Sequence, residues 1–372
     1  MPDVNPDVNS GANAAAGSRR AEVSSATPDL APSDALRRIA YLLERALEPS
    51  YRVQAFRRAA AVLDTLPAAQ LSARVAAGSL QELPGIGKVT ALAITEAASG
   101  EVPAYLRRLE ATADRPVAEG GAEVRTAIRG DCHTHSDWSD GGSPIEEMAM
   151  VGRGLGHEWM ALTDHSPRLT VARGLSPERL RDQLQVVAGL NEWWAPFRLL
   201  TGIEVDILQN GELDQQPALL AEVDVVVASV HSLLRMPGPE MTRRMVAAVA
   251  NPHTDVLGHC TGRNVTSSGR RGRTRPESDF DAEVVFEACR RFGVAVEINC
   301  RPERLDPPKR LLRLAVQTGC LVAIDTDAHA PGQLDWQPYG CDRAEACGVP
   351  VDSVITTWSA DRLLAWTAAH AA

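Results

Sequence analysis

The sequence predicts an α/β domain built on a barrel-forming parallel sheet, preceded by a small all-helical domain. From Ile128 onward, short apolar runs alternate with helical stretches, which is typical of a parallel sheet. Polar side chains follow these runs directly, as they do at the carboxyl ends of barrel strands. Before residue 113, apolar residues recur every three or four positions, which indicates helices.

Composition limits the possible classes of protein. The chain has 372 residues, room for about two domains, and a net charge of −10, so it is not a general nucleic-acid binder. Seven scattered cysteines without a CxxC pair argue against a disulfide framework and favour a reducing compartment. No signal-peptide pattern or membrane-length apolar stretch occurs. We expect a cytoplasmic protein without a membrane partner, and no obligate protein partner is evident.

The first segments of the chain differ sharply in composition. Residues 1–29 are rich in Ala, Ser, Asn, Pro and Gly and are predicted to be a disordered tail. The next segment, 30–112, is predicted to be a helical domain. Its first helix has a cap at Ser33 or Asp34. Pro49 ends that helix, whose expected apolar positions are Leu36, Ile39, Ala40, Leu43 and Leu47. A second helix carries Val53, Phe56, Ala60 and Leu63, with Arg52, Arg57 and Arg58 alongside.

A glycine-rich turn, Leu83-Pro84-Gly85-Ile86-Gly87-Lys88, precedes a further helix. Two glycines around one apolar residue let the backbone turn tightly, with N–H groups facing outward at the positive end of the helix. Such a turn can bind phosphate. The alternative is an ordinary turn between two helices.

The second domain is predicted to span 128–372, after a linker over 113–127 that contains Pro116 and Gly120-Gly121. Seven strands are expected, near 128–133, 159–163, 199–205, 223–230, 255–258, 293–298 and 321–325. The intervening helices are expected at 144–155, 177–193, 240–250, 281–292 and 308–318. Seven parallel strands with polar residues at their carboxyl ends fit a closed barrel whose site lies at that face.

The stretch from Asp131 to Gly141 carries the first candidate metal ligands. His133 and His135 alternate on a strand, so both can aim at one point, and the following turn can return Asp140. Imidazole and carboxylate together suit zinc, manganese or iron. Two alternating histidines by themselves are more often a polar strand end. Here six of the nine histidines, and two carboxylates, occupy strand-end positions: His133, His135, His165, His231, His259, His329, Glu204 and Asp327.

These motifs resemble the polymerase and histidinol phosphatase (PHP) family of metalloesterases. The resemblance covers about 128–358 and implies a seven-stranded, distorted TIM-like barrel that binds up to three divalent ions, zinc or manganese, with iron as a further option. It implies that Glu204 bridges ions and that the ligands are His133, His135, Asp140, His165, Glu204, His231, His259, Asp327 and His329. Ions around a carboxylate suit phosphoester hydrolysis. Glu204 and His259 are the candidate catalytic residues, together with Arg263 of the Gly-His-x-Thr-Gly-Arg pattern, in which Cys260 replaces a common proline.

The helical domain resembles the amino-terminal domain of family-X DNA polymerases, and its turn resembles a helix-hairpin-helix motif. The resemblance implies DNA binding, through Gly85, Gly87, Lys88, Arg52 and Arg57. Over residues 30–115, eleven basic and nine acidic residues give a charge of +2, as phosphate contact requires. A solvated helical face would show the same charge. Ala93 stands where relatives carry a lysine for abasic-site cleavage, so we expect no lyase activity.

Three functions remain open at this level. In bacterial family-X polymerases the palm and fingers lie between the helical domain and the PHP domain. This sequence has no room for them between its two domains, so no polymerase activity is expected. The first hypothesis is a DNA-processing nuclease, a 3′-5′ exonuclease or repair enzyme. The second is a small-molecule phosphatase resembling histidinol phosphatase. The third is a DNA-binding protein whose barrel is only a scaffold, against which the full ligand set argues.

Overall fold

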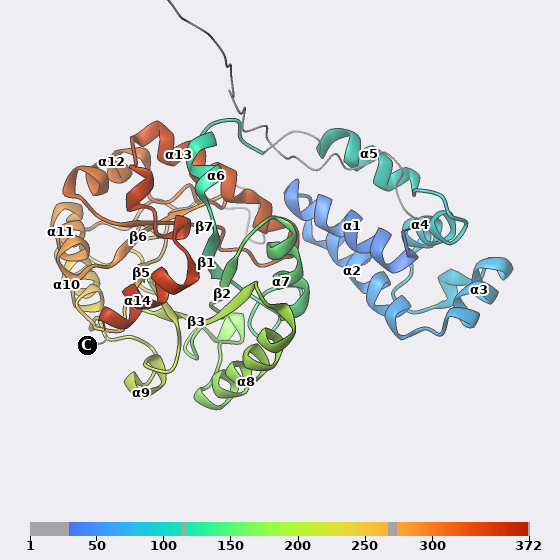
Figure 1. Ribbon diagram of the computed structural model, residues 1–372, viewed down its shortest axis with the longest axis horizontal. Helices are drawn as coiled ribbons and strands as arrows, with labels where there is room; N and C mark the ends of the chain where they lie inside the picture. The colour runs from blue at the N-terminus through green and yellow to red at the C-terminus, as the bar shows by residue number, and fades with distance from the viewer. Residues whose placement is uncertain (1–29, 114–116, 267–273, 371–372) are drawn as a thin grey trace, which may run out of the picture.

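The amino-terminal part of the fold is a small group of packed helices. The computed structural model describes residues 30–113, 117–266 and 274–370, so the predicted tail over 1–29 lies outside the described residues. The helical unit comprises α1 (Pro32–Arg45), α2 (Ser50–Thr65), α3 (Ala68–Ala77), the 3₁₀ turn η1 (Leu80–Glu82), α4 (Lys88–Ala98) and α5 (Ala104–Ala113). It lies beside the barrel in Figure 1, next to α7 (Ile145–Gly154). The predicted helical domain before an α/β domain is therefore confirmed.

The first helix confirms the predicted spacing but corrects both of its ends. Leu36 and Ile39 are fully buried, as their spacing requires. The helix begins at Pro32, whose missing N–H costs nothing at the first turn, and neither Ser33 nor Asp34 caps it. It ends at Arg45, so Leu47 lies outside it, with φ of 56° and 38% of its surface exposed. Pro49, close behind, disfavours continuation of the helix.

Within the described residues, seven parallel strands form one sheet in the order of the sequence. One isolated parallel bridge between Thr134 and Ala328 joins the segment after the last strand to the first strand, and the His135 N–H donates to the Ala328 carbonyl at 2.9 Å. The result is the predicted, nearly closed barrel. Its strands are β1 (Gly130–Thr134), β2 (Trp159–Leu162), β3 (Arg198–Asp206), β4 (Val225–Ser229), β5 (Val256–Leu257), β6 (Ala295–Asn299) and β7 (Val322–Asp325).

Helices cover the outside of the barrel (Figure 1). The five that the sequence predicts are α7 (Ile145–Gly154), α8 (Pro177–Trp194), α10 (Gly238–Val249), α11 (Ala282–Phe292) and α12 (Lys309–Thr318). The sequence does not predict α6 (Ala122–Ala127), which lies in the expected linker, or α9 (Pro217–Leu220), α13 (Gln337–Cys347) and α14 (Ala360–His370). Short 3₁₀ segments complete the fold: η2 (Thr170–Ala172), η3 (Pro331–Trp336), η4 (Val351–Ser353) and η5 (Ile355–Thr357).

The carboxyl-terminal helices close the end of the barrel opposite the candidate site. Leu363 of α14 and Trp358 pack with residues at the beginnings of strands, such as Val225 and Val256. This cluster fills the amino ends of the strands with apolar side chains, so polar groups gather at the carboxyl ends. All seven cysteines, each in the described part of the chain, are free and buried. In the same part, no helix is long and apolar enough to cross a membrane.

Candidate metal centre

The carboxyl ends of the strands bring the predicted ligand side chains together. His133 lies on β1 and Glu204 on β3, while Asp327 and the other candidate histidines follow a strand within four residues. The predicted turn returns Asp140, because the N–H groups of Ser139 and Gly141 both donate to the Ser136 carbonyl. Gly141 is needed there, since a Cβ atom would lie 2.5 Å from that carbonyl oxygen. The local structure that the sequence predicts around Asp140 is therefore present.

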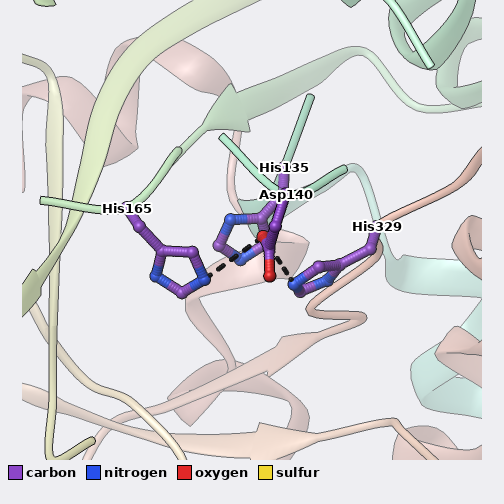
Figure 2. Close-up of side chains that lie close together, drawn as sticks. All are labelled: His135, Asp140, His165 and His329. Atoms are coloured by element: carbon purple, nitrogen blue, oxygen red, sulfur yellow. Dashed lines mark ion pairs between the residues drawn. The ribbon is translucent and has the colours of Figure 1, made fainter. Parts of the chain in front are cut away.

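Eight of the nine candidate ligands fall into three overlapping groups. In each group, one ligand atom per residue lies within 4.8 Å of the others. The groups are His135, Asp140, His165 and His329; His133, His135 and Asp327; and His165, Glu204 and His231. Figure 2 shows the first group, in which Asp140 Oδ1 lies 3.4 Å from His165 Nε2 and 3.2 Å from His329 Nε2. Shared members connect the groups into one cluster.

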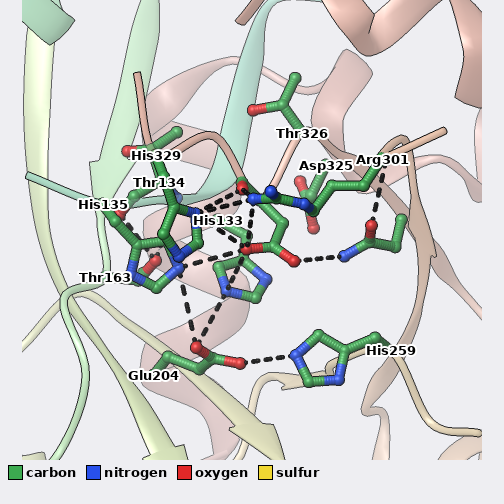
Figure 3. A network of polar contacts seen from close by, with 12 residues as sticks. His133, Thr134, His135, Thr163, Glu204, His259, Arg301, Asp325, Thr326 and His329 are labelled. Atoms are coloured by element: carbon green, nitrogen blue, oxygen red, sulfur yellow. Dashed lines mark hydrogen bonds and ion pairs between the residues drawn. The ribbon is translucent and has the colours of Figure 1, made fainter. Parts of the chain in front are cut away.

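Glu204 lies at the centre of the cluster and faces histidines from four strands. Its Oε2 atom lies 2.8 Å from His165 Nδ1 and 3.4 Å from His133 Nε2. Its Oε1 atom lies 2.9 Å from His259 Nε2 and 3.2 Å from His231 Nε2. Figure 3 shows the contacts of Glu204 with His133 and His259 as dashed lines. A carboxylate with each oxygen facing two imidazoles has the geometry of a bridging ligand.

Many polar atoms of the cluster are buried without a hydrogen-bond partner among the described residues. They include both ring nitrogens of His135 and of His231, one oxygen each of Asp140 and Glu204, and single ring nitrogens of His133, His165 and His259. Buried polar groups nearly always have hydrogen-bond partners, so this set indicates a ligand from outside the chain. Imidazole and carboxylate donors without thiolate fit zinc, manganese or iron. The residues present therefore fit a group of divalent ions.

The cluster also shifts the pKa values of its members. Burial opposes the charged form of Glu204, yet His231, His133 and His165 outweigh it and hold the pKa of the carboxyl well below its usual range. Burial likewise opposes the charged form of His231, but Glu204 and Asp206 raise its pKa to about 9. Glu204 is thus ionised at neutral pH, and metal binding must displace protons from imidazoles such as His231.

Two buried carboxylates that the sequence reading missed orient the ligands. Glu297 lies 2.5 Å from His133 Nδ1 and accepts a 2.5 Å hydrogen bond from the His259 N–H. Asp164 accepts hydrogen bonds from Ser136, Ser139 and Gln183, and so fixes the turn before Asp140. A signal for Glu297 was available, because it is the one charged residue in the apolar run Val294–Ile298. Partners of this kind tune metal affinity.

Two arginines lie closer to the ligands than the predicted Arg263 does. The guanidinium of Arg263 donates to the carbonyls of Arg304 and Leu305 and lies 3.4 Å from Glu277, so it fastens the loop after β6. Arg304 Nε instead lies 3.2 Å from Asp327 Oδ2. Arg301 donates to the Asp327 carbonyl at 2.7 Å and lies 2.9 Å from His329 Nδ1. These two cations, against the opposing effect of burial, hold the pKa of Asp327 well below its usual range.

The predicted DNA-binding residues divide into two sets. Gly85, with φ of +93°, lies exposed with Gly87 and Lys88 at the beginning of α4, and Arg52 is exposed on α2. The Gly87 N–H, however, donates to Thr90 Oγ1 at 2.9 Å instead of facing outward as expected, because Thr90 caps the helix.

Arg57 does not lie on this exposed surface. Its guanidinium pairs with Glu44 and with Glu147 of α7, and only 12% of its side-chain surface is exposed. It therefore links the helical unit to the barrel, and in this arrangement it cannot contact a phosphate. The sequence reading placed it with Arg52 because both lie on one basic helix, and helical spacing alone does not show what packs against that helix.

Comparison with known proteins agrees with both halves of this fold. A helix-hairpin-helix domain model matches residues 30–101, and a PHP domain model matches residues 131–299. Both matches lie where the motifs predict a helix-hairpin-helix domain and a PHP domain. The DNA polymerase/3′-5′ exonuclease PolX of Bacillus subtilis is 39% identical over 239 residues, which cover 61% of this chain and 41% of that protein. This chain therefore spans about two fifths of that relative's length.

Other relatives consist largely of the matched region. A protein of Thermoanaerobacter sp. (strain X514) named "Probable phosphatase" is 26% identical over 238 residues, 61% of this chain and 89% of that protein. A crystal structure of histidinol phosphate phosphatase from Lactococcus lactis, complexed with zinc, L-histidinol and phosphate, covers 59% of this chain and 92% of that chain. Its TM-score of 0.41 and identity of 18% are too low to support an inference about this chain.

Proposed function

We propose that this chain is a metal-dependent phosphoesterase that acts on DNA, either as a 3′-5′ exonuclease or as a repair-type nuclease. The observation that carries the proposal is the cluster of buried, unpaired imidazole and carboxylate atoms at the open end of the barrel. Bound divalent ions would lower the pKa of a water molecule and neutralise the oxygens of a phosphate. The proposed division is a helical DNA-binding domain over 30–112, a linker over 113–127 and a PHP domain over 128–372.

The chain's own residues have distinct roles in this proposal. The nine candidate ligands would hold the ions, with Glu204 shared between them. Burial and the nearby Arg304 cation lower the pKa of His259, which favours the neutral imidazole that metal binding requires. Arg304 and Arg301 place positive charge beside Asp327, at the edge of the cluster, where a phosphate oxygen could approach. The exposed turn over Gly85–Lys88 would hold the DNA backbone.

Two comparisons support DNA as the substrate. The matched helix-hairpin-helix domain is attached to the same chain as the barrel. The most identical relative reported above is named for a DNA polymerase and 3′-5′ exonuclease activity. A second candidate is a small-molecule phosphatase resembling histidinol phosphatase. The observation that favours it is the match to the Thermoanaerobacter protein over nearly all of that protein's length.

The deciding experiment offers both substrates to the same manganese-loaded protein. The DNA is labelled at its 5′ end and is either single-stranded or recessed at its 3′ end, and histidinol phosphate is assayed in parallel. The proposal predicts a ladder of shortened DNA that His133→Ala abolishes. Release of phosphate from histidinol phosphate, with the DNA intact, would establish the second candidate instead.

A further inference from the structure

The helical unit docks on the barrel through a buried ionic contact. Glu44, at the end of α1, is only 6% exposed. Its carboxylate accepts hydrogen bonds of 2.9 and 2.8 Å from Arg57, and one of 2.9 Å from the Gly332 N–H of η3. Arg57 also pairs with Glu147 on α7. One acid and one base of the helical unit therefore contact two different elements of the barrel.

The same contact brings two backbones into direct contact. A Cβ atom on Gly332 would lie 2.1 Å from the Tyr41 carbonyl oxygen and 2.9 Å from the Arg45 nitrogen. Trp336 Nε1, at the other end of η3, donates to the Arg45 carbonyl at 3.0 Å. Arg45 also pairs with Asp335. The end of α1 thus covers the whole length of η3, and glycine is the one residue that permits this approach.

The two barrel elements that Glu44 and Arg57 contact, η3 and α7, are attached to ligands of the same group. The segment η3 begins two residues after His329, whose N–H donates to Gln333 Oε1 at 2.8 Å. Helix α7 begins five residues after Asp140. The Gly142 N–H, between Asp140 and α7, donates to the His329 carbonyl at 2.7 Å. His329 and Asp140 belong to the four-residue group of Figure 2.

These two ligands are also the least buried of the nine. The side chain of Asp140 is 30% exposed and that of His329 is 21% exposed, whereas Glu204 and Asp327 are at most 2% exposed. Burial within the barrel therefore holds the other ligands more firmly than these two. Helix α7 and η3 pack behind the loops of Asp140 and His329. The helical unit in turn packs on α7 and η3.

We infer that the helical domain supports one side of the metal centre, and that Glu44 and Arg57 position the loops that carry His329 and Asp140. The inference rests on the proposed metal centre but not on DNA as the substrate. It assigns the helical domain a second role besides DNA binding. Disturbing the docking should therefore weaken the ion held by the group of Figure 2 and leave the deeper ions in place.

The test uses the full chain with Gly332→Ala, which touches no ligand and forces α1 away from η3. Gly154→Ala on α7 is the matched control, because nothing lies within 4 Å of its Cβ position. Manganese and zinc binding are titrated by calorimetry, ion content is counted after dialysis, and thermal unfolding is recorded. We expect Gly332→Ala to weaken one ion about 10- to 100-fold, as the loss of a ligand's supporting partner does, with the other ions unchanged.

A second variant keeps the test decisive if Gly332→Ala does not fold. Glu44→Gln retains an oxygen for the Gly332 N–H but removes the charge that pairs with Arg57, and it should weaken the same ion by a smaller factor. If folded variants lose thermal stability while every ion binds as in the wild type, the contact only stabilises the fold and the inference is wrong. If the wild type binds its ions but leaves DNA intact, the proposed substrate fails and this inference stands.

Discussion

Two buried charged clusters in this protein differ in whether their polar atoms have partners. Around Glu44, the carboxylate oxygens accept hydrogen bonds from Arg57 and Gly332. Around Glu204, by contrast, nine buried nitrogen and oxygen atoms of the candidate ligands have no hydrogen-bond partner among the described residues, although several of them face one another at ion-pair distance. Burying charge is costly unless it is paired. The first cluster is therefore explained by docking within the chain, whereas the second indicates a ligand from outside it.

The largest effect is expected from removing the charge at the centre of the second cluster. Glu204→Gln should lower phosphoester hydrolysis by on the order of 10³-fold or more, because bound ions contribute several kcal/mol of transition-state stabilisation. The variant should also bind fewer ions, as counted by elemental analysis. Near wild-type hydrolysis with fewer ions would show that the centre is structural.

Breaking the first cluster should affect stability instead. Arg57→Met leaves Glu44 buried without a cation and should lower the free energy of unfolding by roughly 3–5 kcal/mol in urea. The exposed neighbour Arg58 supplies the control, since Arg58→Met should change stability by about 0.5 kcal/mol or less. If Arg57→Met instead reduces the salt dependence of DNA binding at unchanged stability, Arg57 is a phosphate contact.

The pH dependence of the metal-free protein should reveal the pairing of His231 with Glu204 and Asp206. The folded pKa of His231 is about 9, against an ordinary value of 6.5, so the charged form is favoured by folding. Its contribution, roughly 3 kcal/mol, is fully present below pH 6.5 and is lost as the pH rises to about 9. The measurement is the free energy of unfolding as a function of pH, with a chelator present, for the wild type and for His231→Asn. If the free energy of unfolding depends on pH in the same way in both proteins, the prediction is wrong.

The partners of the ligands should matter less than the ligands. Glu297→Gln weakens the acceptor at His133 Nδ1 and should reduce metal affinity about 10- to 100-fold without abolishing binding. Glu283→Gln, at an exposed position on α11, is the control and should bind metal normally. Equal affinities in the two variants would leave Glu297 with a purely structural role.

The smallest effect concerns the exposed turn of the helical unit. Lys88→Ala should weaken DNA binding several-fold and reduce the slope of log affinity against log salt by about 0.7–0.9, the value for one phosphate contact. Lys309 is the matched control, because it is also the exposed first residue of a helix, α12. If Lys309→Ala changes the slope equally, the turn is not a specific contact.

The sequence allowed correct predictions for those features of the fold and the site that depend on a single local pattern. Apolar runs ending in histidine located the strands and, because parallel strands share one carboxyl end, predicted that Glu204 and the histidines meet. Glu297 was missed because its role depends on a neighbouring strand. Arg57 was assigned to DNA because no local pattern shows that α7 supplies its partner. Helix α13 was missed because Gly340 interrupts its pattern, whereas in the fold a Cβ there would lie 2.4 Å from Cys300 Sγ.

Counting ions tests most directly whether the unpaired atoms around Glu204 form a metal centre. The purified full chain is stripped with a chelator, reloaded with manganese or zinc, dialysed and analysed for bound metal per protein. We expect close to three ions per chain, falling in Glu204→Gln and unchanged in Glu283→Gln. Less than one ion per chain in a folded, reloaded wild type would contradict the metal centre and the function proposed from it.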